Sequence, residues 1–202
     1  MQPSIGTDYN FFVKESSKLQ RLLGDIRSLS PKYQTIIGEI VMLRLFGLLE
    51  ITLCSVAKKI VCGARYLDGS AALTLHNAKS ISGAELAMKK HNRPSRVELR
   101  WSSVRHVKKN IEFVIDKSDN YVLQIDKSVS EFNEMRRIRN YIAHRNQSTR
   151  QQYRGIVSKY YGAYVNRITP GILIMNEQHV RPRLIDQYFG MARTLVGDLV
   201  KK

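Results

Sequence analysis

The chain has 202 residues, 43% of them hydrophobic, which suits one folded globular domain and argues against a disordered segment. Lysine and arginine total 33 against 17 acidic residues, and the formal net charge of +16 favours a polyanionic partner. Cys54 and Cys62 fall in one expected helix, about 12 Å from each other, which excludes a disulfide between them and indicates a reducing compartment.

Two amphipathic helices are predicted at the N-terminus. Between Asp8 and Leu29, apolar residues recur three and four positions apart, as one face of a helix requires. The dipeptide Ser30-Pro31 ends this helix and starts a second, with the serine placed to cap and the proline at the first helical position. The apolar pattern then continues to Gly63, where glycine is a natural stop.

The most apolar stretch, residues 36–57, is not typical of a membrane span. Glu39, Arg44 and Glu50 interrupt it and would place charges inside the bilayer. Residues 1–12 also lack the basic start and the apolar run of a secretory signal. We therefore expect a cytoplasmic protein with no membrane partner.

The middle of the chain is less regular. Residues 64–100 have the character of an insertion or excursion. Within them, Ser82-Gly-Ala-Glu85 has the form of a capping box that opens a short helix ending before Pro94. A further helix is predicted over residues 103–116, where apolar residues share one face and basic residues lie off it.

Three more helices are predicted toward the C-terminus. Ser128-Val-Ser-Glu131 has the form of a second capping box, and apolar residues follow it at helical spacing. A tyrosine-rich pattern over residues 153–164 predicts the next helix, and residues 183–200 predict the last. The short apolar run between them, GILIM, is compatible with a strand or a buried loop.

These patterns predict an all-α fold. We expect a helical bundle in a single domain over residues 1–202, with at most a minor strand near residues 171–175. The sequence contains no internal repeat, low-complexity tract or convincing linker.

Several common catalytic signatures are missing from the sequence. It contains no G-x-x-x-x-G-K-[ST] loop, G-x-G-x-x-G turn, G-x-S-x-G elbow or C-x-x-C pair. The five histidines show no H-x-x-x-H or H-E-x-x-H spacing, so no local helical metal site is encoded, although ligands gathered from distant segments stay open. We expect no cofactor and no metal ion.

Basic residues cluster in two stretches. Residues 86–110 carry eight basic side chains and one acid, and residues 135–154 carry six and none. Such clustering favours contact with a phosphate backbone, although small basic proteins also carry such surfaces without a specific ligand. The candidate RNA contacts are Arg137, Arg145, Arg150, Arg154, Lys108 and Lys109. The helical spacing of three tyrosines favours a core or interface role over base stacking: Tyr153, Tyr160 and Tyr161.

The segment RRIRNYIAHRN, residues 136–146, contains the residue types that metal-free RNA cleavage needs. Histidine supplies proton transfer near neutral pH, and arginine supplies fixed charge with a forked donor set that matches phosphate oxygens. His144 and Arg139 are therefore the candidate catalytic residues, and Asn140 is placed to orient either one. One histidine performs only half of the proton transfer, and a second copy in a symmetric dimer would complete it.

The motif Arg139-Asn140-Tyr-Ile-Ala-His144 resembles the R-x4-6-H signature of the HEPN superfamily, in which a polar residue commonly follows the arginine. The resemblance covers residues 128–147. It implies an all-helical fold and a metal-independent endoribonuclease that acts as a homodimer with a composite active site, in a bacterial toxin, phage-defence or RNA-processing setting. It also implies Arg139 and His144 as catalytic residues and Asn140 as their support.

Helical geometry separates the two implied catalytic residues. In a continuous helix, Arg139 would lie roughly 140° around the axis from His144, toward the apolar side. Either the helix bends or ends inside the motif, so that the two side chains converge, or the polar stripe is a solvated face. The family resemblance favours the first reading.

Two further readings of the function stay open. The chain is alternatively a non-catalytic HEPN-like module, in which the basic surface binds nucleic acid and an apolar helix face serves dimerisation. In a third reading it is the toxin of a two-component system, held inactive by an antitoxin or another regulatory partner.

Overall fold

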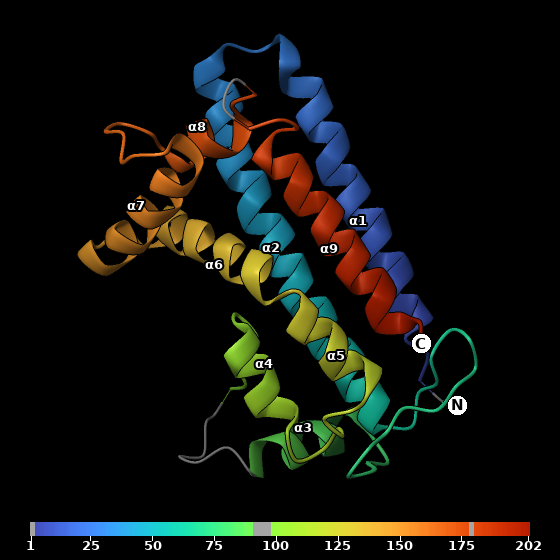
Figure 1. The fold of residues 1–202 in the computed structure, drawn as a ribbon. Coiled ribbons are helices and arrows are strands. Elements are labelled where there is room, and N and C mark those ends of the chain that lie inside the picture. Colours follow the sequence, from blue (N-terminus) through green and yellow to red (C-terminus); the bar gives the residue numbers. More distant parts are fainter. Residues whose placement is uncertain (1–2, 91–97, 178–179) are drawn as a thin grey trace. The chain divides into compact units, whose positions relative to one another are not determined.

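The computed structural model describes residues 3–90, 98–177 and 180–202. Within these ranges the chain forms nine α-helices and one short 3-10 helix (Figure 1), and its only β-type pairings are two isolated bridges. The all-α fold predicted from the sequence is confirmed.

Contacts along the chain divide it into two compact units, each assembled from separate segments. Unit 1 comprises Met1–Val13, Leu49–Ser130 and Arg193–Lys202, and unit 2 comprises Lys14–Leu48 and Glu131–Ala192. Three long helices are divided between the units, and a fourth contributes its first two residues to unit 1 and the rest to unit 2. The arrangement as a single domain stays a prediction.

The first two helices follow the apolar pattern of the sequence. Helix α1 (Gly6–Asp25) leads through the 3-10 helix η1 (Ile26–Ser28) to the 31-residue helix α2 (Pro31–Val61). The Ser30 carbonyl oxygen accepts the backbone N–H of Gln34 at 3.1 Å, as the first helical bond of α2. The helix stops where predicted, because Gly63 takes a φ of 84° that side chains disfavour.

Among the described helices, α2 is long and apolar enough to cross a membrane by length and composition. In the folded chain, 56% of its most apolar window is buried inside the protein. The core helix of a soluble protein has the same properties, so this finding alone decides nothing about location.

Unit 1 contains three shorter helices, α3 (Ile81–Lys90), α4 (Val104–Ile111) and α5 (Asn120–Lys127). Helix α3 begins before Ser82, which therefore does not cap it as predicted. Instead, the Ser80 hydroxyl oxygen accepts the Gly83 N–H at 3.1 Å. The predicted end of this helix before Pro94 lies outside the described residues. Helix α5 was not predicted, and Asp119 caps its start by accepting the Tyr121 N–H.

Asp119 also organises the buried centre of unit 1. One carboxylate oxygen accepts the Tyr66 hydroxyl and the Tyr121 N–H, and the other accepts the Leu73 N–H at 2.7 Å. The Tyr121 hydroxyl donates to the Leu53 carbonyl oxygen at 2.9 Å. These bonds satisfy polar groups that would be costly to bury unpaired, and they fix the irregular segment after α2 to the start of α5.

Unit 2 consists of the second half of α1, the first half of α2, most of α6 (Val129–Ala143), all of α7 (Gln147–Tyr161) and α8 (Pro170–Met175), and the first half of α9 (Leu184–Val200). Residues 171–175 form a helix and not a strand or a loop, because Thr169 caps it and Pro170 occupies its first turn. Helix α8 lies against the start of α2 (Figure 1), where a Cβ on Gly171 would come within 2.3 Å of the Thr35 carbonyl oxygen.

The start of α6 differs from its prediction. Ser128 is the C-cap of α5, and its hydroxyl donates to the Gln124 carbonyl oxygen at 3.1 Å. It therefore does not open α6 as the first residue of a capping box. The serine ends one helix instead of starting the next, so α5 and α6 follow each other with almost no connection.

Glu134 anchors α6 in unit 2. Its carboxylate accepts the Tyr160 hydroxyl of α7 at 2.5 Å and the Tyr188 hydroxyl of α9 at 2.7 Å, and it pairs with Lys159 at 2.5 Å. Burial, and then the charge of Glu134, raise the pKa of Tyr188 well above its ordinary value. Both tyrosines therefore stay neutral donors, and the cluster fixes α6 against α7 and α9.

Candidate functional site at the junction of α6 and α7

Helix α6 ends inside the R-x4-6-H motif. Ala143 is its last residue, and His144 lies immediately beyond it. The His144 N–H still donates to the Asn140 carbonyl oxygen at 2.9 Å, closing the final turn. The His144 carbonyl oxygen then accepts the Asn146 N–H and the Thr149 hydroxyl, each at 2.5 Å. The chain therefore leaves the helix at the histidine.

A capping box starts the next helix three residues later. The Asn146 side chain accepts the Thr149 N–H at 3.0 Å, and the Thr149 hydroxyl oxygen accepts the Asn146 N–H at 3.2 Å. These reciprocal bonds satisfy donors at the start of α7 that have no partner in the helix. The connection around His144 is therefore short and held at both ends.

Arg139 does not project freely into solvent. Its guanidinium carbon lies 5.7 Å from the centre of the Phe46 ring on α2, within the range of a cation–π contact. Its Nη1 donates to Oδ1 of Asn140 at 3.1 Å. The side chain is half-buried. Asn140 therefore contacts Arg139, and its role in orienting a motif residue stays a prediction.

His144 is exposed, in contrast to Arg139. Among the described residues, its imidazole makes no hydrogen bond or ion pair. Within one chain the structure therefore joins Arg139 to Asn140 and leaves the histidine facing solvent.

Arg145 is held at the edge of this junction by Glu39 of α2. Its Nη2 lies 3.3 Å from Oε2 of Glu39, and Oε1 of the same carboxylate accepts the Gly171 N–H of α8 at 3.0 Å. The Glu39 side chain is mostly buried, whereas 63% of the Arg145 side chain is exposed. The carboxylate therefore ties the motif to α2 and α8 and leaves much of the arginine accessible.

The exposed face of α7 continues the basic surface. Gln147, Arg150, Gln151 and Arg154 line an open polar depression of about 620 Å³. The guanidinium carbon of Arg154 lies 4.8 Å from the centre of the Tyr164 ring. Both arginines are exposed, as the predicted phosphate contacts require.

The other predicted RNA contacts have different surroundings. Arg137 is exposed on α6. Lys108 pairs with Asp126 at 2.9 Å, and Lys109 is half-buried; both belong to unit 1, whereas the motif belongs to unit 2. The carboxylate of Asp126 partly offsets the positive potential that Lys108 would present to a phosphate.

Of the three singled-out tyrosines, Tyr153 has the core role that its spacing favoured, and Tyr160 is half-buried between helices. Tyr153 is buried and stacks on Tyr141 with ring centres 4.6 Å apart, and Tyr160 donates to Glu134. Tyr164, which the sequence did not single out, is exposed beside Arg154. No local sequence pattern distinguishes it from its neighbours.

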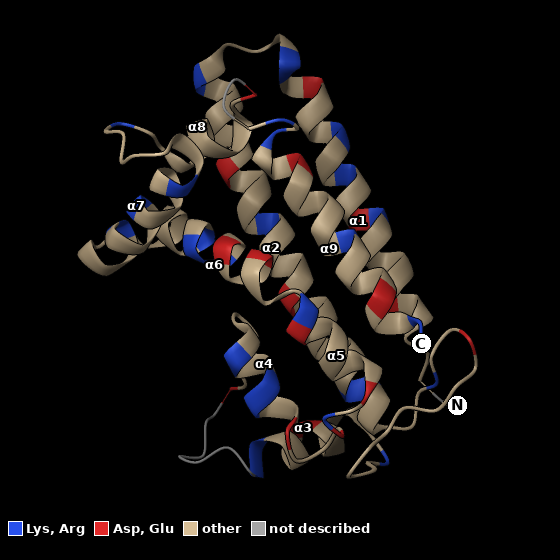
Figure 2. Cartoon of the chain, viewed as in Figure 1, with Lys and Arg blue, Asp and Glu red and all other residues tan. Residues whose placement is uncertain are grey.

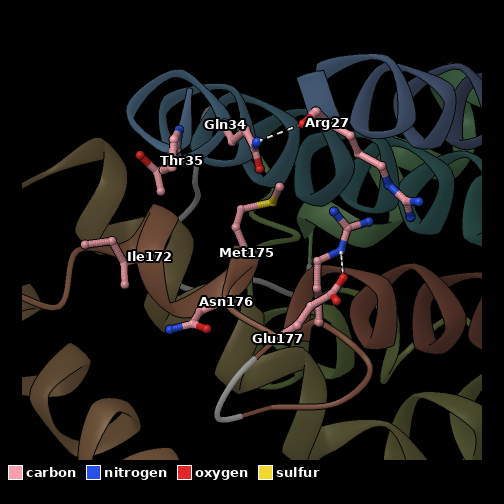
Figure 3. A pocket seen from close by; sticks show the side chains of 9 residues that line it. Arg27, Gln34, Thr35, Ile172, Met175, Asn176 and Glu177 are labelled. Atoms are coloured by element: carbon pink, nitrogen blue, oxygen red, sulfur yellow. Dashed lines mark hydrogen bonds and ion pairs between the residues drawn. The ribbon is translucent and has the colours of Figure 1, made fainter. Parts of the chain in front are cut away.

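A second cavity of unit 2 lies between the start of α2 and α8 (Figure 3). It measures about 600 Å³, and its lining includes Arg27, Gln34 and Thr35 on one side and Ile172 and Met175 on the other. The Gln34 amide nitrogen donates to the Arg27 carbonyl oxygen at 3.2 Å and to the Leu29 carbonyl oxygen at 2.7 Å. These bonds fix the connection between α1 and α2.

Comparisons of the chain with protein-family models, with curated proteins and with solved structures found no match. Within the described ranges, no three His, Cys, Asp or Glu side chains are grouped as a metal ion would require. Function is therefore inferred from the residues themselves and from their geometry.

Proposed function

We propose that the chain is a metal-independent endoribonuclease of the HEPN superfamily, acting in the cytoplasm as a homodimer. The observation that carries this proposal is the exposed His144 at the end of α6, followed at once by Arg145 and by the arginines of α7. This arrangement brings an accessible proton-transfer group beside phosphate-binding groups.

The reaction assigned to this site is attack of a ribose 2′-hydroxyl on the adjacent phosphate. His144 takes the 2′-hydroxyl proton, the 2′-oxygen bonds to phosphorus, and the bond to the 5′-oxygen breaks. The products carry a 2′,3′-cyclic phosphate and a 5′-hydroxyl. Because one histidine cannot also protonate the leaving oxygen at the same moment, His144 of a second copy supplies that proton.

Arg139 stabilises the negative charge that accumulates on the phosphorane. Its donation to Asn140 and its contact with Phe46 restrict the guanidinium to one orientation, which lowers the cost of ordering it during the reaction. Asn140 is thus the positioning residue of the motif.

The test of this chemistry uses an RNA oligonucleotide and purified chain in the presence of a chelator. We expect cleavage with cyclic phosphate and 5′-hydroxyl ends, and no cleavage where a single 2′-deoxynucleotide replaces the one before the cut. Products with a 5′-phosphate, or unchanged cleavage of the 2′-deoxy substrate, would exclude attack by the 2′-hydroxyl.

The second candidate function is a non-catalytic module that binds nucleic acid. The packing of Arg139 against Phe46 favours it, since a half-buried arginine of this kind also serves helix packing alone. RNA binding that survives replacement of both Arg139 and His144 by alanine, without cleavage at any protein concentration, would select this candidate.

The proposed setting is a toxin or phage-defence system with an antitoxin or another regulatory partner. Expression of the chain alone in bacteria is then expected to arrest growth, and His144→Ala is expected to relieve the arrest. Growth arrest that persists in the His144→Ala variant would show that the toxicity does not depend on the proposed cleavage reaction.

A further inference from the structure

Large apolar side chains are exposed around the connection between α1 and α2. In the described part of unit 2, five of the seven exposed large hydrophobic residues fall between residues 22 and 40. These are Leu22 at 39% exposure, Leu29 at 42%, Tyr33 at 57%, Ile36 at 48% and Ile40 at 50%. We call this set the hairpin patch. Such a concentration of apolar surface in one short segment marks a contact with another surface.

The packing of unit 2 leaves the hairpin patch uncovered. Other residues of α2 meet α8: a Cβ on Gly38 would contact Met175, and Thr35 lies against Gly171. Tyr33 and Ile36 stand on a different side of the same helix and stay exposed. The patch is therefore not the face by which α2 joins the described core.

Positive charge surrounds the hairpin patch. Arg21, Arg27 and Lys32 are exposed, and none forms an ion pair with any described residue. The carboxylates between residues 21 and 40 are Asp25 and Glu39, and Glu39 is already paired with Arg145. Figure 2 shows basic residues on both sides of the connection between α1 and α2. The partner therefore has to accept apolar side chains and neutralise cations at once.

We propose that the hairpin patch docks on an anionic lipid membrane surface. The apolar side chains enter the boundary between headgroups and acyl chains, the Tyr33 ring lies at headgroup depth, and the three cations contact lipid phosphates. A second copy of the chain that docks through the same patch is a poorer occupant, because Arg21, Arg27 and Lys32 of the two copies would then face each other without counter-charges.

This contact is peripheral and leaves α2 within the fold. The sequence-based expectation of no membrane partner rested on charges inside residues 36–57, which oppose a span and do not oppose surface binding. A cytoplasmic protein also faces the leaflet that carries the anionic lipids. The inference is independent of the proposed ribonuclease activity, since no hairpin residue belongs to the junction of α6 and α7.

The experiment measures co-sedimentation of the whole chain with two kinds of vesicle, phosphatidylcholine alone and phosphatidylcholine mixed with phosphatidylserine. We expect binding to the mixed vesicles only. The triple variant Leu29→Ala/Tyr33→Ala/Ile36→Ala is expected to weaken it about tenfold or more. Arg21→Gln/Arg27→Gln/Lys32→Gln is expected to weaken it roughly fivefold per charge removed.

A matched control separates insertion from general attraction of a basic protein to an anionic surface. Leu73, Leu75 and Phe113 of unit 1 are also exposed, at 44%, 59% and 48%, and their replacement by alanine is expected to leave vesicle binding unchanged. In addition, a tryptophan placed by Tyr33→Trp should be quenched by lipids with a nitroxide in the acyl chain, and one placed by Leu75→Trp should not.

Equal loss of binding in the two alanine triples, or no quenching at position 33, would overturn the proposal. It would also be overturned if the Leu29, Tyr33 and Ile36 substitutions converted an oligomer to a monomer without changing vesicle binding. That outcome would assign the hairpin patch to a second copy of the chain.

Discussion

The guanidinium carbon of Arg139 lies 5.7 Å from the ring centre of Phe46, so the arginine of the motif packs against α2 while His144 faces solvent. Arg139 packs against Phe46, and we also propose that its charge stabilises the phosphorane. Substitutions can separate these two contributions. Its contribution to packing is measurable without any substrate.

We expect Arg139→Ala to lower the free energy of unfolding by about 1 kcal/mol, because it removes the cation–π contact and the packing of a half-buried side chain. Arg137→Ala is the control, since this exposed arginine of the same helix should change stability by less than about 0.5 kcal/mol. Urea denaturation compares the two variants. Equal effects would show that Arg139 has no packing role.

Glu39 is expected to matter more to stability than its partner Arg145. Glu39→Ala leaves the buried N–H of Gly171 without an acceptor and should cost about 1–3 kcal/mol. Arg145→Ala should cost less than about 1 kcal/mol, because 63% of its side chain is exposed and solvent screens the pair. A larger loss with Arg145→Ala in thermal or urea unfolding would show that the ion pair outweighs the hydrogen bond.

The close approach of α8 to α2 makes Gly171 intolerant of a side chain. A Cβ there would come within 2.3 Å of the Thr35 carbonyl oxygen, so Gly171→Ala forces the helices apart and should cost about 1–3 kcal/mol. Gly155→Ala in α7 meets nothing within 4 Å and should instead stabilise the protein by about 0.5–1 kcal/mol. Melting temperatures that shift in the same direction would contradict this account of the contact.

The stability of unit 1 should depend on pH through Glu85. Hydrogen bonds from Lys58 and Lys89 lower the pKa of this carboxyl from 4.5 to about 2. Its folded pKa is thus depressed, so its stabilising contribution is present above about pH 4.5 and disappears as the pH falls toward 2. We expect Glu85→Gln to destabilise the protein at neutral pH and the difference to vanish near pH 2. An equal difference at both pH values would exclude this linkage.

The long helices were predictable because their apolar residues repeat over many turns. Helix α5 was missed because it spans only two turns, and its signal at the start is the single residue Asp119. The run GILIM was ambiguous, since five apolar residues fit a strand or a buried helix, although Thr169 and Pro170 are typical of a helix start. Ser82 and Ser128 were predicted to be N-caps from local spacing alone. That spacing does not determine the residue at which a helix begins, and Ser82 lies inside α3 while Ser128 ends α5.

The candidate site shows the same limit. A local pattern identified Arg139, Asn140 and His144, because all three lie within six consecutive residues. It gave no sign of Phe46 or Glu39, which contact the motif from positions about a hundred residues earlier. Contacts of this kind arise only when α2 and α6 pack together, and a single sequence does not encode them in any local spacing.

Cleavage of RNA by His144→Ala is the most direct measurement of the central claim. The matched control is His76→Ala, which removes an exposed histidine that lies in unit 1, whereas His144 lies in unit 2. In the presence of a chelator, we expect His144→Ala to lose cleavage by about a hundredfold or more, as removal of a general acid and base requires, and His76→Ala to retain it. Cleavage that is unchanged in His144→Ala would contradict the proposed function.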